Sequence, residues 1–336
     1  MNRALVYHGA RDVRLESLPD PTPPDSRGAI VRVTHTAICG SDLHLYHGAL
    51  PVPPGFTLGH EFIGEVVETG RDVRGFKSGE RVLVSGVIGC GDCRMCASGH
   101  PVRCERGLPR VFGNSRDMPG GQAEAVAVPA ADTAMLRVPD GVTSEQAVLL
   151  TDILPTGYYG AKNADIRPGQ SVAVVGLGPV GQCALDCAQL FGAARVFAID
   201  RVPERLETAR AKGAIPIDGA KDPLGQIHAA TGGQGVDAVI EAVGADETIA
   251  LSLQLVRVAG AVSVIGVSTN FAFPFNMLAA LMRDLTFRIG NLPSARALGR
   301  PCAAGASGSV EAGVRVHAPP ATLAGRRGLC ALRFAA

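Results

Sequence analysis

The sequence has little of what would direct it to a membrane or to nucleic acid. Its formal net charge is only +1, so it lacks the broad electrostatic field that attracts nucleic acid or an anionic membrane surface. No apolar run reaches the roughly 18 to 20 residues of a membrane span. The first residues, MNRALVYHGARDVRLESL, alternate polar and apolar side chains, which is not typical of a signal peptide. We therefore expect a cytoplasmic protein without nucleic-acid or membrane partners.

Aromatic residues are also scarce, at 4% of the chain, which favours a substrate pocket lined mainly by aliphatic side chains.

The length of 336 residues suffices for two domains, each with its own core. Up to about residue 150, β-rich runs are separated by glycine and proline, and they occupy residues 29–38, 62–70, 80–87 and 123–139. This texture predicts a small barrel or sandwich.

From about residue 153, apolar strands alternate with helical patterns. The expected strands are residues 171–176, 195–200, 214–218, 236–244 and 261–267, and the expected helices are residues 179–193, 203–213 and 246–260. This alternation is typical of a parallel sheet covered by helices. We therefore predict an α/β chain with a barrel-like domain at residues 1–152 and a doubly wound parallel sheet at residues 153–290.

The motif SVAVVGLGPVG predicts a dinucleotide site. Its first glycine allows a tight turn, its second lets a pyrophosphate approach the backbone, and its third lets helix and strand pack closely. The next expected strand ends in Asp200, whose carboxylate can accept hydrogen bonds from ribose hydroxyls. The residues that we assign to this site are Gly176, Gly178, Pro179, Val180, Gly181, Asp200 and Arg201.

Asp200 also bears on the choice of nucleotide. A carboxylate at this position would repel the 2′-phosphate of NADP, which favours NAD. Arg201 leaves the alternative open, because its guanidinium could pair with that phosphate.

Two motifs in the first half, TAICGSDLHLYHG and LGHEFIGEVVETG, supply Cys39, His60 and Glu61. A thiolate and an imidazole suit zinc, and a catalytic zinc usually has three protein ligands and one open position. Asp152 is the candidate for the third ligand, because it lies at the seam of the two predicted domains, where a cleft would form.

The stretch GCGDCRMCASGHPVRC contains four cysteines with the spacing C-x2-C-x2-C-x7-C. Four thiolates on one short loop fit a closed tetrahedral metal site, which would be structural because no position is left for substrate. A disulfide knot would need an oxidising compartment, and a reactive redox patch is the third alternative. The four residues are Cys90, Cys93, Cys96 and Cys104. Two further cysteines, Cys183 and Cys187, are expected to pack in the core.

Taken together, these motifs closely resemble the zinc-dependent medium-chain alcohol dehydrogenases, from residue 1 to about residue 296. The similar stretches are CGSDLH, GHEFIGEVVETG and VAVVGLGPVG. The resemblance implies a GroES-like barrel domain joined to a Rossmann domain, a second zinc on the four-cysteine loop, and a homo-oligomer, either dimer or tetramer. It also implies that Cys39, His60 and Asp152 bind the catalytic zinc, with Glu61 beside it.

The expected activity is hydride transfer between an alcohol, or the matching aldehyde or ketone, and NAD. Zinc polarises the alcohol oxygen and favours loss of its proton. Ser41 can accept that proton, and His44 can pass it toward solvent. The alternatives are a polyol, amino-alcohol or formaldehyde dehydrogenase, or a non-catalytic chain that binds NAD and zinc.

Residues 291–336 form an atypical C-terminal segment rich in alanine, glycine and arginine, without sustained periodicity. Read one base later, the codons for Ala297 and Leu298 can encode His-Trp, and those for residues 316–322 can encode Phe-Thr-His-Arg-Leu-Pro-Leu. Residues 328–333 can likewise become Ala-Tyr-Ala-Leu-Phe-Asp, and these strings resemble the closing segment of the family. We therefore hypothesise that a one-base shift near Arg296 replaced the native tail.

Overall fold

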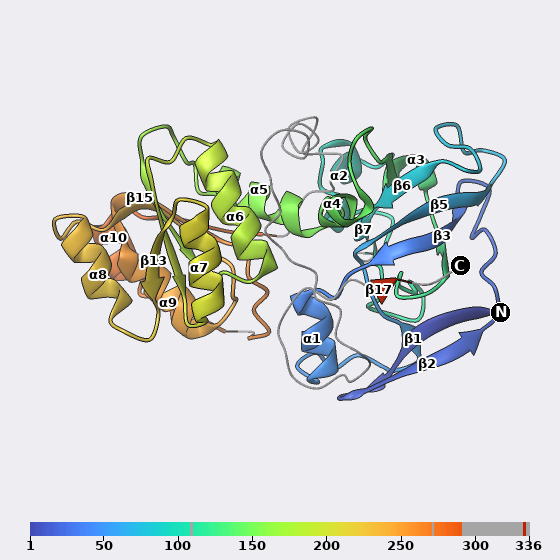
Figure 1. The fold of residues 1–336 in the computed structure, drawn as a ribbon, viewed down its shortest axis with the longest axis horizontal. Coiled ribbons are helices and arrows are strands. Elements are labelled where there is room, and N and C mark those ends of the chain that lie inside the picture. The colour runs from blue at the N-terminus through green and yellow to red at the C-terminus, as the bar shows by residue number, and fades with distance from the viewer. Residues whose placement is uncertain (108–109, 271, 291–331, 334–336) are drawn as a thin grey trace. The chain divides into compact units, whose positions relative to one another are not determined.

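The computed structural model describes residues 1–107, 110–270 and 272–290, together with the backbone of residues 332–333 (Figure 1). Two compact units divide the chain. The first spans Met1–Pro155 and includes the short strand β17 (Leu332–Arg333), and the second spans Thr156–Asn291. Apart from that strand, the atypical C-terminal segment and the hypothesis of a frame shift lie outside the described residues.

The first unit is built mainly from antiparallel strands around β3. Its strands are β1 (Asn2–Gly9), β2 (Asp12–Leu18), β3 (Ala29–Thr36), β4 (Phe56–Thr57), β5 (Phe62–Thr69), β6 (Arg81–Val84), β7 (Val87–Ile88), β8 (Arg110–Val111), β9 (Ala125–Val128) and β10 (Met135–Arg137). One sheet has the order β10-β6-β5-β3-β17, with β9 also paired to β3, another has the order β2-β1-β4, and β7 pairs with β8. The largest core of this unit lies between these strands, and in it the rings of Phe62 and Phe112 meet edge to face at 5.1 Å. Smaller clusters contain Tyr7 and Ala4 of β1.

Short helices connect these strands and lead into the second unit. They are α1 (Gly40–Tyr46), α2 (Arg94–Ala97), the 3₁₀ turn η1 (Pro101–Arg103), α3 (Ala131–Ala134), α4 (Ser144–Leu149) and α5 (Ile153–Asn163). Helix α4 begins with a capping box, in which Thr143 and Gln146 each accept a backbone N–H of the other. This cap fixes the start of the segment that leads to Asp152.

The second unit is a parallel sheet with the strand order β13-β12-β11-β14-β15-β16. Its strands are β11 (Ser171–Val175), β12 (Arg195–Asp200), β13 (Ile215–Asp218), β14 (Val236–Glu241), β15 (Val256–Val264) and β16 (Thr286–Ile289). Its helices are α6 (Pro179–Leu190), α7 (Pro203–Ala211), α8 (Pro223–Ala230), α9 (Asp246–Leu255) and α10 (Met277–Met282). Strand β11 pairs with both β12 and β14, so the chain reverses its direction across the sheet between β11 and β14.

The prediction of a helix over residues 246–260 was wrong in its second part. Helix α9 ends at Leu255, and β15 begins at Val256. Val256 lies opposite Val236 in the sheet, and the Arg257 Nε atom donates to Asp237 Oδ1 at 2.8 Å. Pairing with β14 therefore overrides a helical pattern in the sequence, because these tertiary contacts outweigh local propensity. Helix α10 and the edge strand β16 follow the last regular strand that the sequence predicted, and β16 lies within LTFRIGNLP, a stretch that the sequence offers as an edge for pairing between subunits.

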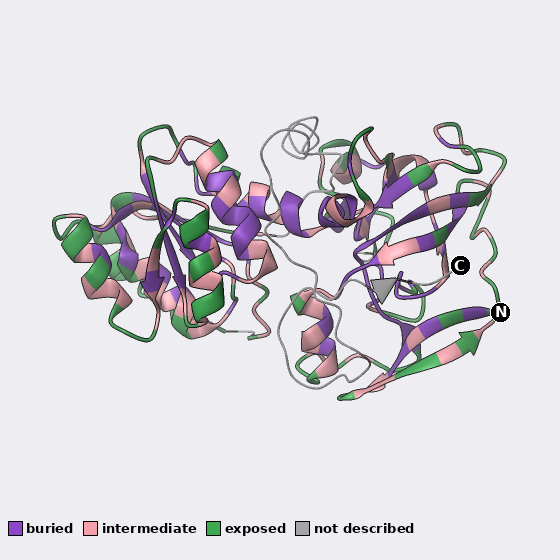
Figure 2. Cartoon of the chain, in the orientation of Figure 1, coloured by how far each residue is buried: buried purple, intermediate pink, exposed green. Residues whose placement is uncertain are grey.

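Crossovers between parallel strands are almost always right-handed, which places helices on both faces of a sheet whose strand order reverses. Helices α6 and α7 carry the chain from β11 to β13 and cover one face, and α9, which carries it from β14 to β15, covers the other. Figure 2 shows the consequence: the central strands are buried, whereas α7 and α8 expose their outer sides. None of the helices in the described ranges is long and apolar enough to cross a bilayer.

Candidate functional site

Four predicted residues from three separate segments meet in the first unit. Cys39 directly precedes α1, His60 and Glu61 directly precede β5, and Asp152 lies between α4 and α5. One ligand atom from each of the four lies within 4.8 Å of the others. We call this group the mixed cluster.

The hydrogen bonds between β3 and β5 explain how distant segments reach this point. The Ala37 N–H donates to the Glu61 carbonyl at 3.0 Å, and the Thr36 hydroxyl donates to the same carbonyl at 2.9 Å. The end of β3, which leads to Cys39, is thereby joined to the start of β5. The cluster therefore depends on a strand pairing that no local motif encodes.

The distances within the mixed cluster suit a shared ion. The Cys39 Sγ atom lies 3.8 Å from Asp152 Oδ2, and the His60 Nε2 atom lies 3.8 Å from the same oxygen. His60 and Glu61 are 5% and 1% exposed, so bulk water does not solvate them. Sulfur, imidazole and carboxylate ligands converge here in a buried place.

Two neighbours of this cluster, Asp42 and Gln122, have no role in the sequence motifs. Asp42 Oδ2 accepts hydrogen bonds from the Cys39 N–H at 2.9 Å and from Gln122 Nε2 at 3.3 Å. Asp42 Oδ1 lies 3.6 Å from His60 Nδ1, on the side of the imidazole away from Asp152. An aspartate in the first turn of a helix signals a cap, but only the fold reveals that it also faces the imidazole.

Burial makes this group of acids unfavourable without a cation. Burial, with Asp152 and Asp42 nearby, raises the pKa of the Cys39 thiol to about 12. Burial likewise raises the pKa of Glu61 well above its usual range. Burial alone would lower the pKa of His60, but the surrounding carboxylates outweigh this effect and raise that pKa. The three pKa shifts share their causes: the groups are buried, so water solvates their charges poorly, and several acidic groups lie close together.

A metal ion would remove this conflict. Asp42 Oδ1, His60 Nδ1 and Glu61 Oε1 are buried, and none has a hydrogen-bond partner among the described residues. Such unsatisfied atoms cost free energy, whereas a divalent cation would stabilise the adjacent anionic ligands. A thiolate, an imidazole and a carboxylate form a ligand set that zinc accepts. The residues present therefore fit a zinc ion.

The predicted proton-handling residues lie on α1. The Ser41 Oγ atom is 3.3 Å from His60 Nε2, so the hydroxyl reaches the mixed cluster itself. His44 lies three residues further along the same helix, which places the two on one face. Burial and the neighbouring His47 lower the pKa of His44, so its imidazole favours the neutral form.

The four cysteines of the 89–104 loop also meet. Their sulfur atoms lie within 4.8 Å of one another, and the Cys90 and Cys96 sulfurs are 4.0 Å apart, far longer than a disulfide. Backbone N–H groups point at the sulfurs, for example from Cys93 to Cys90 Sγ and from Cys96 to Cys93 Sγ, both at 3.4 Å. N–H groups from Glu105 and Cys96 help lower the pKa of Cys93 to about 6. The arrangement fits a closed metal site.

The glycine loop of the second unit has the geometry that the motif predicts. Gly176 has φ +88°, which side-chain-bearing residues rarely adopt, and a side chain on Gly181 would overlap the Gly176 carbonyl. A Cβ on Gly178, by contrast, would meet nothing within 4 Å. Because packing does not require this glycine, the open space above it fits a ligand that approaches the backbone. Gly178 is also the N-cap of α6, whose first two residues are Pro179 and Val180.

Asp200 ends β12 beside this loop, and its carboxylate already has several partners. Oδ2 accepts from the Leu177 N–H at 2.7 Å, and Oδ1 accepts from the N–H groups of Arg201 and Val202 at 2.7 and 2.9 Å. The guanidinium of Arg205 lies 3.3 Å from Oδ2. A ribose hydroxyl would therefore have to share or replace the contact with Arg205, which sequence analysis did not identify.

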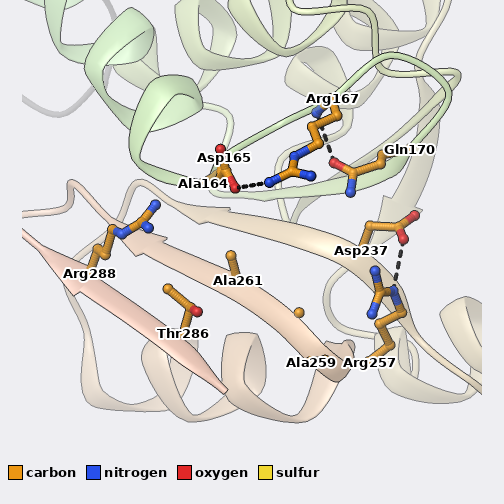
Figure 3. A pocket seen from close by; sticks show the side chains of 11 residues that line it. Ala164, Asp165, Arg167, Gln170, Asp237, Arg257, Ala259, Ala261, Thr286 and Arg288 are labelled. Atoms are coloured by element: carbon orange, nitrogen blue, oxygen red, sulfur yellow. Dashed lines mark hydrogen bonds and ion pairs between the residues drawn. The ribbon is translucent and has the colours of Figure 1, made fainter. Parts of the chain in front are cut away.

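A polar cavity of about 200 Å³ lies at the amino ends of the strands, opposite the glycine loop (Figure 3). Four of its charged side chains are paired, Arg257 with Asp237 at 2.8 Å and Arg167 with Asp165 at 2.9 Å, and Arg288 donates to a backbone carbonyl at 2.7 Å. Asp237 also accepts hydrogen bonds from the N–H and the hydroxyl of Ser171, both at 2.7 Å. This network ties β11, β14 and β15 together and is not the predicted site.

Comparison with known proteins agrees with this architecture. Residues 25–140 match the alcohol dehydrogenase GroES-like domain, and residues 179–294 match the zinc-binding dehydrogenase domain. A probable zinc-binding alcohol dehydrogenase of Mycobacterium tuberculosis is 48% identical over 295 residues, which are 88% of this chain and 76% of that protein. The predicted fold class, a GroES-like barrel and a Rossmann sheet, is thereby confirmed.

Solved structures agree as well. An alcohol dehydrogenase from Thermus sp. ATN1 is 40% identical and superimposes with a TM-score of 0.85, covering 91% of this chain and 89% of that one. A zinc-binding dehydrogenase from Sinorhizobium meliloti 1021, solved with NADP, is 30% identical with a TM-score of 0.80, again covering 91% of this chain and 89% of that one. Because that relative binds NADP, the comparisons leave the choice of nucleotide open.

Proposed function

This chain belongs to the zinc-dependent medium-chain dehydrogenase family, and from this premise we propose that it transfers hydride between an alcohol, or the matching aldehyde or ketone, and NAD. The observation that carries the proposal is the buried mixed cluster, with the Ser41 hydroxyl 3.3 Å from His60. A hydroxyl beside a buried metal-binding group is what removal of an alcohol proton requires.

In this proposal Cys39, His60 and Asp152 hold the catalytic zinc, and Glu61 lies beside them. Zinc bound there would supply Lewis-acid polarisation of the alcohol oxygen. Asp42 contributes by facing His60 Nδ1 at 3.6 Å, which orients the imidazole so that Nε2 points at the other ligands. The burial of the cluster excludes water that would weaken these interactions.

Ser41 and His44 handle the proton. The Ser41 hydroxyl accepts the alcohol's proton as it releases its own toward His44, one turn further along α1, and His44 releases a proton to solvent. A neutral His44 can accept a proton, and the lowered pKa of its imidazole keeps it neutral around pH 7.

The dinucleotide occupies the glycine loop, with its pyrophosphate above Gly178 and its ribose at Asp200. The open space at Gly178 supports the first assignment. The carboxylate of Asp200 favours NAD over NADP, because it would repel a 2′-phosphate. Arg201 and Arg205 are the residues that could offset this preference, since the Arg205 guanidinium reaches Asp200 at 3.3 Å.

This nucleotide preference has a direct test. Asp200→Ala should weaken NAD binding about tenfold, as loss of charge-assisted hydrogen bonds predicts, and should weaken NADP binding less. Asp218→Ala is the matched control, because Asp218 ends the adjacent strand opposite Asp200. Fluorescence titration with the reduced nucleotides measures both affinities, and an equal loss for the two would contradict the ribose role.

The four-cysteine loop holds a structural zinc in this proposal. All four ligand positions would be filled by Cys90, Cys93, Cys96 and Cys104, so substrate has no access to the ion. Free thiols used as ligands suit the reducing conditions of the cytoplasm, where we place the protein.

We also propose that the protein assembles with further copies of itself through β16 and α10. Strand β16 ends the described sheet, so its outer edge can pair with the same strand of a second copy. Met277, Leu278, Leu281 and Met282 on the adjacent α10 are between 68% and 76% exposed. An apolar surface of this kind is typical of an interface. Leu281→Asp should reduce the mass measured by light scattering to that of a monomer, and an unchanged mass would contradict this interface.

The activity itself is tested by reduction of NAD with primary, secondary and polyhydric alcohols, amino alcohols and formaldehyde, with and without a zinc chelator. Formation of NADH that the chelator abolishes would support the proposal and identify the substrate class. A folded, zinc-loaded sample that binds NAD but reduces none of it would contradict the proposal and favour the non-catalytic alternative.

A further inference from the structure

Glu241 is a fully buried carboxylate to which neither the motifs nor the proposed chemistry gives a role. It is the last residue of β14 and is 0% exposed. Within the described part of the chain it forms no ion pair with lysine or arginine, although a buried unpaired charge is costly. Other contacts must therefore offset the cost of burying this carboxylate.

That set consists of backbone N–H groups and one hydroxyl. Glu241 Oε1 accepts from the N–H groups of Val243 and Gly244, both at 2.9 Å, and from the Thr248 hydroxyl at 2.8 Å. Oε2 accepts from the Gly244 N–H at 3.1 Å. The carboxylate thus acts as a template around which residues 242–244 turn, and it joins this turn to the first part of α9.

The turn lies against the glycine loop. The Ala242 N–H donates to the Val175 carbonyl at 2.9 Å, directly before Gly176. A side chain on Gly176 would overlap Val243 Cγ2, so the two residues are in close contact. On its other side, a side chain on Gly266 would overlap the Gly244 backbone. The ends of β11, β14 and β15 are therefore packed together through this turn.

This position is significant because of the sheet topology. Ligands of open α/β sheets bind beyond the carboxyl ends of the strands, where the strand order reverses. Here the reversal lies between β11 and β14, so the glycine loop forms one wall of the crevice and the 242–244 turn forms the other. Val243 is 43% exposed on that second wall, although it is apolar, so it is available to contact a ligand.

We propose that Glu241 is a positioning residue for the dinucleotide: its carboxylate fixes the 242–244 turn, so that Val243 forms the wall opposite the glycine loop. This role rests on the proposed dinucleotide-linked function. Burial raises the pKa of Glu241, and the N–H groups of Gly244 and Val243 and the Thr248 hydroxyl partly offset that effect. The ionised form is the one that can accept all of these hydrogen bonds.

Glu241→Gln tests the role with little change of shape. The variant replaces an acceptor oxygen with an NH₂ group among N–H donors, and it also removes a buried charge. Stability and cofactor binding should therefore respond differently. The free energy of unfolding changes little, because removal of the buried charge offsets the weakened hydrogen bonds. The Kd for NADH rises about tenfold, because binding must then order the 242–244 turn. A purely structural role would change the two together.

Glu247→Gln is the matched control, because Glu247 is an exposed residue in the first turn of α9 and loses the same charge. NADH fluorescence measures Kd for the full chain, and thermal unfolding measures stability. Hydrogen exchange without nucleotide follows the amides of residues 242–248, which should exchange faster in E241Q than in the wild type or E247Q. If E241Q does not fold, Glu241→Asp keeps the charge but withdraws the carboxylate, and it should weaken NADH binding in the same way.

The outcomes separate this proposal from the function on which it rests. An E241Q variant that binds NADH as tightly as the wild type would overturn the positioning role alone. Weaker binding that merely follows the loss of stability would overturn it too. A folded wild-type chain that binds neither NADH nor NADPH would contradict the proposed function and this role with it.

Discussion

The mixed cluster and the four-cysteine loop are both groups of side chains that could hold a metal ion, yet they are built in opposite ways. The four cysteines come from fifteen consecutive positions and offer one kind of ligand atom. The mixed cluster joins residues up to 113 positions apart, such as Cys39 and Asp152, and offers sulfur, nitrogen and oxygen. One site can be recognised from spacing alone, whereas the other exists only after the strands have paired.

The two clusters also differ in how far hydrogen bonds from the protein satisfy their ligand atoms. Backbone N–H groups donate to the sulfurs of Cys90, Cys93 and Cys104 in the loop, which stabilises these thiolates locally, whereas burial raises the pKa of Cys96 to about 12. In the mixed cluster, Glu61 Oε1 and His60 Nδ1 are buried without a hydrogen-bond partner among the described residues. A site whose ligands are satisfied suits a structural ion, and a site that retains unsatisfied groups suits reactivity.

The largest expected effect on activity comes from removing a ligand of the mixed cluster. Cys39→Ala should abolish alcohol oxidation, lowering kcat by roughly four orders of magnitude or more, because it removes a ligand of the proposed reactive zinc. Metal analysis should show one zinc lost per chain and one retained in the four-cysteine loop. Loss of both ions would mean that the two clusters are not independent.

The second-largest effect on kcat is expected from loss of the Ser41 hydroxyl beside the mixed cluster. Ser41→Ala should lower kcat by roughly 10²- to 10³-fold, the range of a lost proton-transfer group. Zinc content and KM for NAD should change little, since Ser41 holds neither group in this account. Steady-state kinetics with metal analysis provides the measurement, and full activity in this variant would remove Ser41 from the proton path.

A smaller effect is expected from the carboxylate behind the imidazole. Asp42→Asn should lower the zinc affinity of the mixed cluster roughly 10- to 100-fold, because Asp42 orients His60 and holds the Cys39 N–H. Competition with a chelator measures this affinity, and added zinc should restore most of the activity. The affinity of the four-cysteine loop serves as the internal control, and an equal loss at both sites would point to general unfolding.

The smallest effect on turnover is expected from the structural site. Cys93→Ala should remove the second zinc and lower the free energy of unfolding by about 3 kcal/mol, as loss of a metal site does. The kcat of the molecules that remain folded should stay within about twofold of the wild type. A large fall in kcat at constant folded fraction would show that this loop takes part in the chemistry.

The sequence predicted the features that local spacing encodes. The glycine loop, the four-cysteine loop and the strands around them follow from short motifs and the period of apolar residues. It did not predict the role of Arg205, whose contact with Asp200 spans only five residues but depends on how α7 follows β12. It also did not predict the roles of Asp42 and Gln122, because these depend on contacts with residues from other segments. It placed the end of α9 wrongly for the same reason, since Val256 leaves the helix to pair with Val236 in the sheet.

In our proposal the mixed cluster is a metal centre distinct from the four-cysteine loop. Crystals of the zinc-loaded protein, measured on both sides of the zinc absorption edge, test it most directly, because anomalous difference density locates each ion. The account predicts two peaks per chain, one within reach of Cys39, His60 and Asp152 and one among the four cysteines. Density at the four cysteines alone, from a sample shown to contain excess zinc, would contradict it.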